Sequence, residues 1–264
     1  MTFNTFTLLT LRVVTLSLLI LDTSGVFSRA AQQPLESFVE GNIKFTSSDA
    51  ISSSVEKRPN HSEKIDVNPL AIAAKHILNT MRETHYTHKT FVDKINGVYD
   101  MDCSGFVGYV LNQIAPEYLA LIPKEPKQPR PRAFKYYEYF HQLQQHSTSV
   151  REWKAINQLM DAMPGDIIAW AMEPITEHAD TGHVMFVAAK PVMNSDGTVS
   201  VKVYDSTAIR HNDDTRSPNS TGIGCGTIVF RVDANGAPVA FQFNTRAKFH
   251  ELPIAIGRSK IYER

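Results

Sequence analysis

The stretch DCSGFVGYVLNQI, residues 102–114, decides what kind of fold the chain can adopt. Its apolar side chains recur at the spacing of one helix face, at Phe106, Val107, Val110, Leu111 and Ile114. Asp102 stands where an N-cap side chain would accept a backbone N–H, so the helix should begin at or just after Cys103. The sequence therefore predicts a helix that packs by one face and carries a cysteine at its N-terminus.

Helical patterns flank this stretch on both sides. Asn68 and Pro69 supply an N-cap and a first-turn proline for a helix that ends near Arg82. Residues 123–132 are rich in proline and basic side chains, which is typical of a surface excursion. Further helices are predicted at residues 134–143 and, roughly, 150–159.

Strand patterns replace the helical ones after Pro164. Apolar runs predict strands at residues 166–171, 183–190, 199–204, 227–232 and 239–243. Turn signals predict hairpins at residues 194–197 and 233–236. Helices followed by hairpin-connected strands indicate an α+β domain, with the N-terminal helices packed on an antiparallel sheet. We assign this domain to residues 67–264.

The N-terminus has the features of a secretory signal peptide. An apolar run that follows Arg12 is too short to span a bilayer. Ser28 and Ala30 fit the small-x-small pattern that signal peptidase reads, which predicts a signal peptide over residues 1–30. An uncleaved anchor or a buried N-terminal strand is the alternative. We expect an exported chain, periplasmic or secreted, with residues 31–66 as a tether and no integral membrane segment in the mature form.

The bulk composition gives no indication of a nucleic-acid partner. The 264 residues are 42% hydrophobic and 20% charged, which is ordinary for a globular domain. The formal net charge is zero, so the basic excess of a nucleic-acid-binding protein is absent. His85 and His88 are spaced like metal ligands, but no cysteine or carboxylate completes a set in the sequence around them. The sequence predicts neither a metal nor a cofactor.

The two cysteines allow two interpretations, a disulfide or a reactive thiol. In an exported chain, Cys103 and Cys225 could form a disulfide. Alternatively, Cys103 is a nucleophile, because a helix N-terminus stabilises a thiolate and lowers the pKa of the thiol. Cys225 lies between two glycines ahead of a strand, which is typical of a small buried residue. We favour the reactive thiol for Cys103.

A thiol nucleophile needs a general base and a group that orients it. His183 opens a predicted strand, where its imidazole can be held rigidly as the base. Asp205 ends the next strand and could lie beside His183 across the hairpin. His211, in a polar loop, competes with Asp205 for this third role. The candidate catalytic residues are therefore Cys103, His183 and Asp205.

Three motifs resemble the NlpC-type cell-wall cysteine peptidases of the papain-like superfamily. They are Asp-Cys-Ser-Gly-Phe at 102–106, Pro-Gly-Asp at 164–166 and Gly-His-Val at 182–184. The resemblance implies a papain-like fold in which Cys103 attacks a carbonyl carbon, His183 moves the proton and the Cys103 N–H lies in the oxyanion hole. It also makes Tyr86, Asp102 and Ser104 candidate substrate-binding residues. The paired glycines usual in the family do not follow Tyr86.

The resemblance implies hydrolysis of amide bonds in peptidoglycan stem peptides, a substrate that an exported enzyme would meet. The same residues would also serve an amidase or acyltransferase that acts on a non-wall peptide, a toxin or a lipid amide. A non-catalytic binding module is a third hypothesis. The retention of Cys103, His183 and Asp205 together favours an enzyme.

Overall fold

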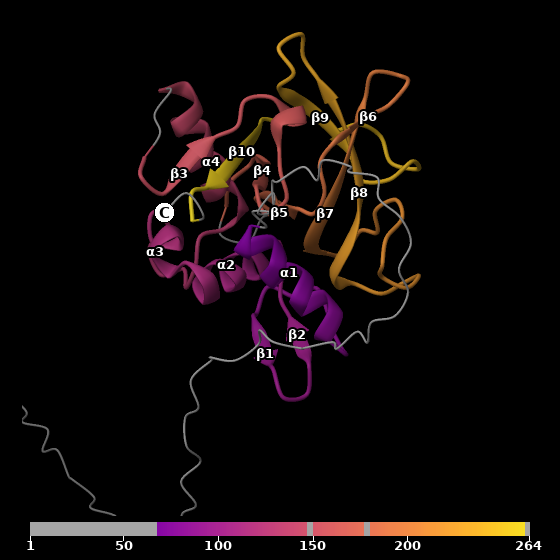
Figure 1. Cartoon of the computed structure of the whole chain (residues 1–264). Helices are drawn as coiled ribbons and strands as arrows, with labels where there is room; N and C mark the ends of the chain where they lie inside the picture. Colours follow the sequence, from indigo (N-terminus) through magenta and orange to yellow (C-terminus); the bar gives the residue numbers. More distant parts are fainter. Residues whose placement is uncertain (1–67, 147–149, 177–179, 262–264) are drawn as a thin grey trace, which may run out of the picture. The chain divides into compact units, whose positions relative to one another are not determined.

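The computed structural model describes residues 68–146, 150–176 and 180–261, which form an α+β domain (Figure 1). The predicted signal peptide and the tether, residues 1–30 and 31–66, lie outside the described residues. Among the residues that are described, no helix is both long enough and apolar enough to cross a membrane.

Three predicted helices are confirmed. Helix α1 (Pro69–Thr80) is capped by Asn68, whose side-chain oxygen accepts the Leu70 N–H at 2.9 Å. Helix α2 (Cys103–Ile114) is capped by Asp102, which accepts the Gly105 N–H at 2.7 Å. Helix α4 (Ala133–Gln145) covers the predicted aromatic segment, and a short helix, α3 (Pro116–Leu119), follows α2. Local capping thus fixes the residue at which α2 begins.

The helix predicted roughly over residues 150–159 is wrong. That segment forms strand β3 (Trp153–Ala155) and a 3-10 turn, Leu159–Asp161. The strand pairs with β10 (Ile254–Ser259), a partner that lies far along the sequence. The Trp153 indole also donates a hydrogen bond to the Tyr118 carbonyl at 3.1 Å. Long-range pairing therefore overrides the local helical pattern.

One large antiparallel sheet occupies most of the described second half. Its strand order is β3-β10-β4-β5-β7-β8-β9, with β6 paired to β7. The predicted strands and both predicted hairpins are present, and a separate hairpin of β1 (Phe91–Asp93) and β2 (Val98–Asp100) precedes α2. The remaining strands are β4 (Ile167–Ala171), β5 (Gly182–Val187), β6 (Val192–Met193), β7 (Val199–Thr207), β8 (Gly222–Val232) and β9 (Pro238–Gln242).

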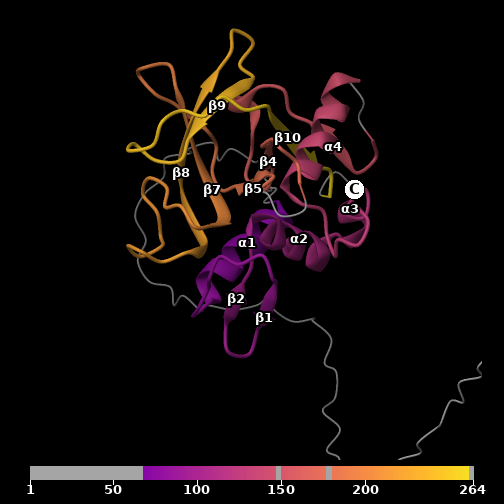
Figure 2. The same cartoon turned by 180° about the vertical axis from the view of Figure 1, so that it is seen from behind.

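The two faces of the sheet carry different parts of the core. Helix α2 packs against β5 and β7, and α4 packs against β4 and β10 (Figures 1 and 2). Along β5, Val184 and Phe186 belong to the apolar cluster under the helices, whereas Met185 belongs to a second cluster on the opposite face. Because side chains alternate along a strand, His183 shares the face of Met185.

The sheet is curved so that its edge strand β9 approaches β4. Trp170 on β4 stacks on Phe241 of β9, with ring centroids 3.8 Å apart, although β5, β7 and β8 separate these strands in the sheet. The second apolar cluster therefore fills the concave face. His183, at the start of β5, lies at one end of that concavity.

Candidate active site

Cys103 is the first residue of α2 and is almost fully buried, with 4% of its surface exposed. The backbone N–H of Val184 on β5 donates a hydrogen bond to its sulfur. The packing of α2 on β5 therefore sets Cys103 beside the residue that follows His183. Cys103 and Cys225 are both free thiols, so the two cysteines do not form a disulfide.

The environment of Cys103 favours the neutral thiol. Burial raises the pKa of Cys103 above its ordinary value, and the nearby Asp102 carboxylate raises it further. The Val184 N–H lowers the pKa but does not outweigh these effects. The sequence predicts a lowered pKa for Cys103 instead. A helix N-terminus can be recognised from the sequence, whereas the burial of the thiol cannot.

Asp102 is the centre of an ionic cluster beneath the thiol. Arg130 donates to both of its carboxylate oxygens at 2.9 Å, and the Ser104 hydroxyl donates to Oδ1 at 3.0 Å. Arg130 also donates to the Ser104 hydroxyl, and His88 Nδ1 lies 3.2 Å from Asp102 Oδ2. Burial raises the pKa of Asp102, but the Arg130 guanidinium and the Gly105 N–H outweigh it and hold the pKa below its usual value.

This cluster changes how the predicted substrate-binding residues are understood. The hydroxyl of Ser104 and both oxygens of Asp102 have partners within the protein, so these two residues support the start of α2. Arg130 comes from the segment predicted as a surface excursion, and its role could not be seen in a run of prolines and basic residues. Tyr86 lines the cavities at both the thiol and the imidazole, and Asp102 and Ser104 also line the one at the thiol. Burial raises the pKa of the Tyr86 phenol, which is therefore a neutral hydroxyl.

The imidazole of His183 is fixed by Asp205. Its Nε2 lies 2.7 Å from Asp205 Oδ2, and this hydrogen bond leaves Nδ1 as the ring nitrogen for another partner. The turn into β5 needs Gly182, which has φ +122°, and a Cβ atom there would lie 2.0 Å from the Trp170 carbonyl oxygen. The strand therefore starts close against β4, with His183 as its first side chain.

Asp205 holds more than one partner. His211 Nε2 lies 2.8 Å from the same oxygen, Oδ2, and Arg216 donates to Oδ1. Asp205 is fully buried, which alone raises its pKa, but His211, Arg216 and the bond from His183 together bring the pKa far below the usual range. From the sequence, Asp205 and His211 are alternatives for the group that orients His183. In the structure both belong to one hydrogen-bond network, and Asp205 is the residue that contacts His183.

Two glycines on β8 make room for this network. A Cβ atom at Gly224 would lie 2.2 Å from Arg216 Nε, and one at Gly226 would lie 2.7 Å from His211 Cβ. The loop that carries His211 and Arg216 therefore lies directly on the strand. Sequence reasoning missed Arg216. The alternate glycines around Cys225 were the available signal, because they mark a close approach of another segment.

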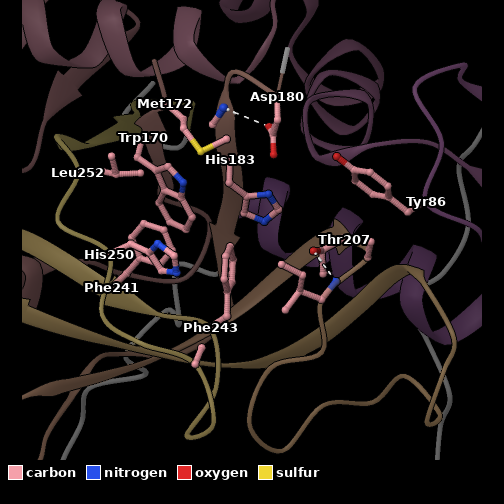
Figure 3. A pocket seen from close by; sticks show the side chains of 14 residues that line it. Tyr86, Trp170, Met172, Asp180, His183, Thr207, Phe241, Phe243, His250 and Leu252 are labelled. Atoms are coloured by element: carbon pink, nitrogen blue, oxygen red, sulfur yellow. Dashed lines mark hydrogen bonds between the residues drawn. The ribbon is translucent and has the colours of Figure 1, made fainter. Parts of the chain in front are cut away.

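The thiol and the imidazole line adjoining cavities. A cavity of about 50 Å³ is lined by Cys103, and one of about 380 Å³ is lined by His183. The two share Tyr86, Asp180 and Gly182. Figure 3 shows His183 between the rings of Trp170, Phe241 and His250 on one side and Tyr86 on the other. Within the described residues, Cys103 and His183 are not hydrogen-bonded to each other, since their bonds go to Val184 and Asp205.

The described residues contain no group of three or more His, Cys, Asp or Glu side chains arranged to hold a metal ion. His85, one of the pair with metal-ligand spacing, bonds to Asp100 at 3.0 Å, and His88 bonds to Asp102.

Comparisons with known proteins found no relative. No protein-family model matches the chain, and neither the characterised proteins nor the solved structures include a significant match.

Proposed function

We propose that this chain is a cysteine hydrolase that cleaves amide bonds, with Cys103 as nucleophile, His183 as general base and Asp205 as the residue that orients the imidazole. The observation that carries the proposal is the hydrogen bond from His183 Nε2 to Asp205, which fixes the ring on the strand whose next backbone N–H contacts the Cys103 sulfur. A nucleophile, a base and an orienting carboxylate are the parts that covalent acyl transfer needs.

The acylation half of the reaction uses the free nitrogen of His183. As the substrate carbonyl approaches, His183 Nδ1 takes the thiol proton and Cys103 Sγ bonds to the carbonyl carbon. The backbone N–H of Cys103, which has no partner from a preceding helical turn, stabilises the oxyanion. The protonated imidazole then gives its proton to the leaving amine as the carbon–nitrogen bond breaks, which leaves a thioester on Cys103.

Deacylation repeats the proton transfers with water as nucleophile. His183 takes a proton from water as the oxygen bonds to the thioester carbon, and the carbon–sulfur bond breaks. The proton then returns to Cys103 and the carboxylic acid product leaves. Because burial favours the neutral thiol, the proton leaves Cys103 during attack rather than before substrate binds. The missing Cys103–His183 hydrogen bond fits this order, since such bonds often tighten only when substrate is bound.

The three motifs and the α+β architecture favour a papain-like, NlpC-type domain within this proposal. By that resemblance the substrate is the stem peptide of peptidoglycan, and the predicted signal peptide would export the mature chain to it. In this proposal Cys103 and His183 act on the scissile amide, and Tyr86 contacts the substrate from the opposite side of the cavity.

The cavity beside His183 favours the second candidate, an amidase for a non-wall peptide or a lipid amide. Among the described residues that line this cavity there is no lysine or arginine to pair with the carboxylates of a stem peptide. Most of its walls are aromatic or aliphatic side chains, as in sites for apolar ligands. This observation bears on the substrate and leaves the proposed chemistry unchanged.

The test is a digest of purified peptidoglycan with residues 31–264, analysed by mass spectrometry. Cys103→Ala is the inactive variant, and Cys225→Ala is the matched control, because it removes the other free thiol. New stem-peptide fragments that appear with the wild type and Cys225→Ala but not with Cys103→Ala would support the wall substrate. If a wider set of amides also yields no Cys103-dependent cleavage, the hydrolase proposal is wrong and the binding module becomes the better account.

A further inference from the structure

The larger cavity differs chemically from the space around the thiol. Trp170 and Phe241 stack in its wall, and Phe241 stacks in turn on His250, with ring centroids 5.4 Å apart (Figure 3). Met172 and Leu252 extend this apolar wall. Since an apolar surface open to water costs free energy unless something covers it, the wall is suited to an apolar part of a ligand.

Two of the polar residues that line the larger cavity also line the cavity at the thiol. Asp180 and Tyr86 line both cavities, so they stand where the two meet. The smaller cavity is only about 50 Å³ and is lined by His88, Asp102 and Ser104, among others. The site therefore has a small polar compartment at Cys103 and a large apolar one beyond His183.

The chemistry assigns the two compartments to opposite sides of the scissile bond. The acyl group becomes attached to Cys103, so it occupies the thiol side. The leaving nitrogen takes its proton from His183, so its substituent lies on the imidazole side. We infer that the aromatic cavity binds an apolar group carried by the leaving amine. The substrates are thus amides with a small acyl part and an aromatic or alkyl substituent on nitrogen. This inference rests on the proposed hydrolase function.

The inference can be tested by binding, without turnover. The protein carries two tryptophans, of which Trp170 lines the cavity and Trp153 lies in the apolar cluster under the helices. Binding in the cavity will change the emission of Trp170. We would titrate full-length Cys103→Ala with N-benzylacetamide, with its isomer N-methyl-2-phenylacetamide and with N-methylacetamide. The isomers have the same atoms, but only N-benzylacetamide carries the ring on the amide nitrogen.

N-benzylacetamide should give a saturable change in Trp170 emission, and its isomer should bind at least about threefold more weakly. N-methylacetamide should leave the emission unchanged at the same concentrations. Leu252→Arg should weaken the binding of N-benzylacetamide about tenfold or more, because it places a charge in the apolar wall. Leu252→Met, the matched control, should leave the affinity for N-benzylacetamide within about twofold of the unsubstituted value. Met172→Arg replaces Leu252→Arg if thermal melting shows that the latter is unfolded.

No saturable change with N-benzylacetamide would overturn the inference, as would an affinity unaffected by arginine in the wall. Equal or stronger binding of the isomer would overturn the assignment to the amine side. These binding measurements do not depend on catalysis. A protein that binds N-benzylacetamide as expected, yet shows no Cys103-dependent cleavage of any amide, would refute the hydrolase proposal alone.

Discussion

Arg216 donates a hydrogen bond to Asp205, and the side chains of both residues are buried, at 3% and 0% exposure. The guanidinium also lies 3.3 Å from Asp214, measured from Nε to Oδ1. The carboxylate that orients His183 is therefore neutralised by a buried cation from a separate loop. The same buried ion pair therefore stabilises the fold and holds Asp205 in place beside His183.

Replacement of Arg216 should destabilise the protein. Arg216→Met removes a cation that offsets the buried charge of Asp205, and breaking a buried ion pair in this way typically costs about 3–5 kcal/mol of unfolding free energy. Urea denaturation followed by circular dichroism measures this loss. Arg246→Met, an exposed position in a nearby loop, is the control and should change stability by less than about 0.5 kcal/mol. Equal stabilities of the two variants would contradict a structural role for the ion pair.

Asp205 and His211 should contribute unequally to turnover. Asp205→Asn removes the charge that fixes the His183 ring and should lower kcat about a hundredfold with little change in KM. His211→Gln acts only through Asp205 and should cost about tenfold or less. Steady-state kinetics on the amide found in the digest compares the two. A larger loss for His211→Gln would transfer the orienting role to His211.

The protein should lose stability in acid through Asp205. Its pKa is lowered in the folded state, so the ionised carboxylate contributes stability above its unfolded pKa of about 3.9. That contribution falls as the pH drops below about 5, by up to about 1.4 kcal/mol per pH unit. Asp205→Asn should have a shallower slope of unfolding free energy against pH between about 5 and 3. Identical slopes would show that Asp205 does not titrate with folding.

The Cys103 thiol should react slowly at neutral pH in the free protein. Because burial raises its pKa, alkylation by iodoacetamide should accelerate steadily past about pH 8.5, the ordinary pKa of a thiol. The Cys225→Ala variant isolates Cys103, and mass spectrometry follows the rate. A plateau of reactivity extending down to about pH 5 would instead reveal a thiolate–imidazolium pair in the resting site.

The parts of the site that sequence could predict depend on short-range features. The Asp102 cap is visible because its partner, Gly105, lies three residues away. The contact between His183 and Asp205 is predictable because β5 and β7 are consecutive in the main sheet apart from the hairpin strand β6. The residue spacing is enough to predict the first contact, and the hairpin signal is enough to predict the second.

The parts that sequence could not predict require segments far apart in the chain. The pairing of β3 with β10 joins residues near 154 and 258, and no local pattern signals it. Arg130 reaches Asp102 from a proline-rich segment, and Arg216 reaches Asp205 over the glycines of β8. The raised pKa of Cys103 has the same origin, since its burial results from how α2 packs on the sheet.

The insertion of β10 between β3 and β4 has a consequence for how the chain acquires its fold. Until Ile254–Ser259 is in place, one edge of β4 has no neighbour, and β3 has no strand to join. During synthesis, the residues of the candidate site emerge well before this strand does. A ribosome-bound chain that ends before Ile254 therefore has Cys103, His183 and Asp205 but not the complete sheet that supports them, so the candidate site reaches its final geometry only once β10 joins the sheet.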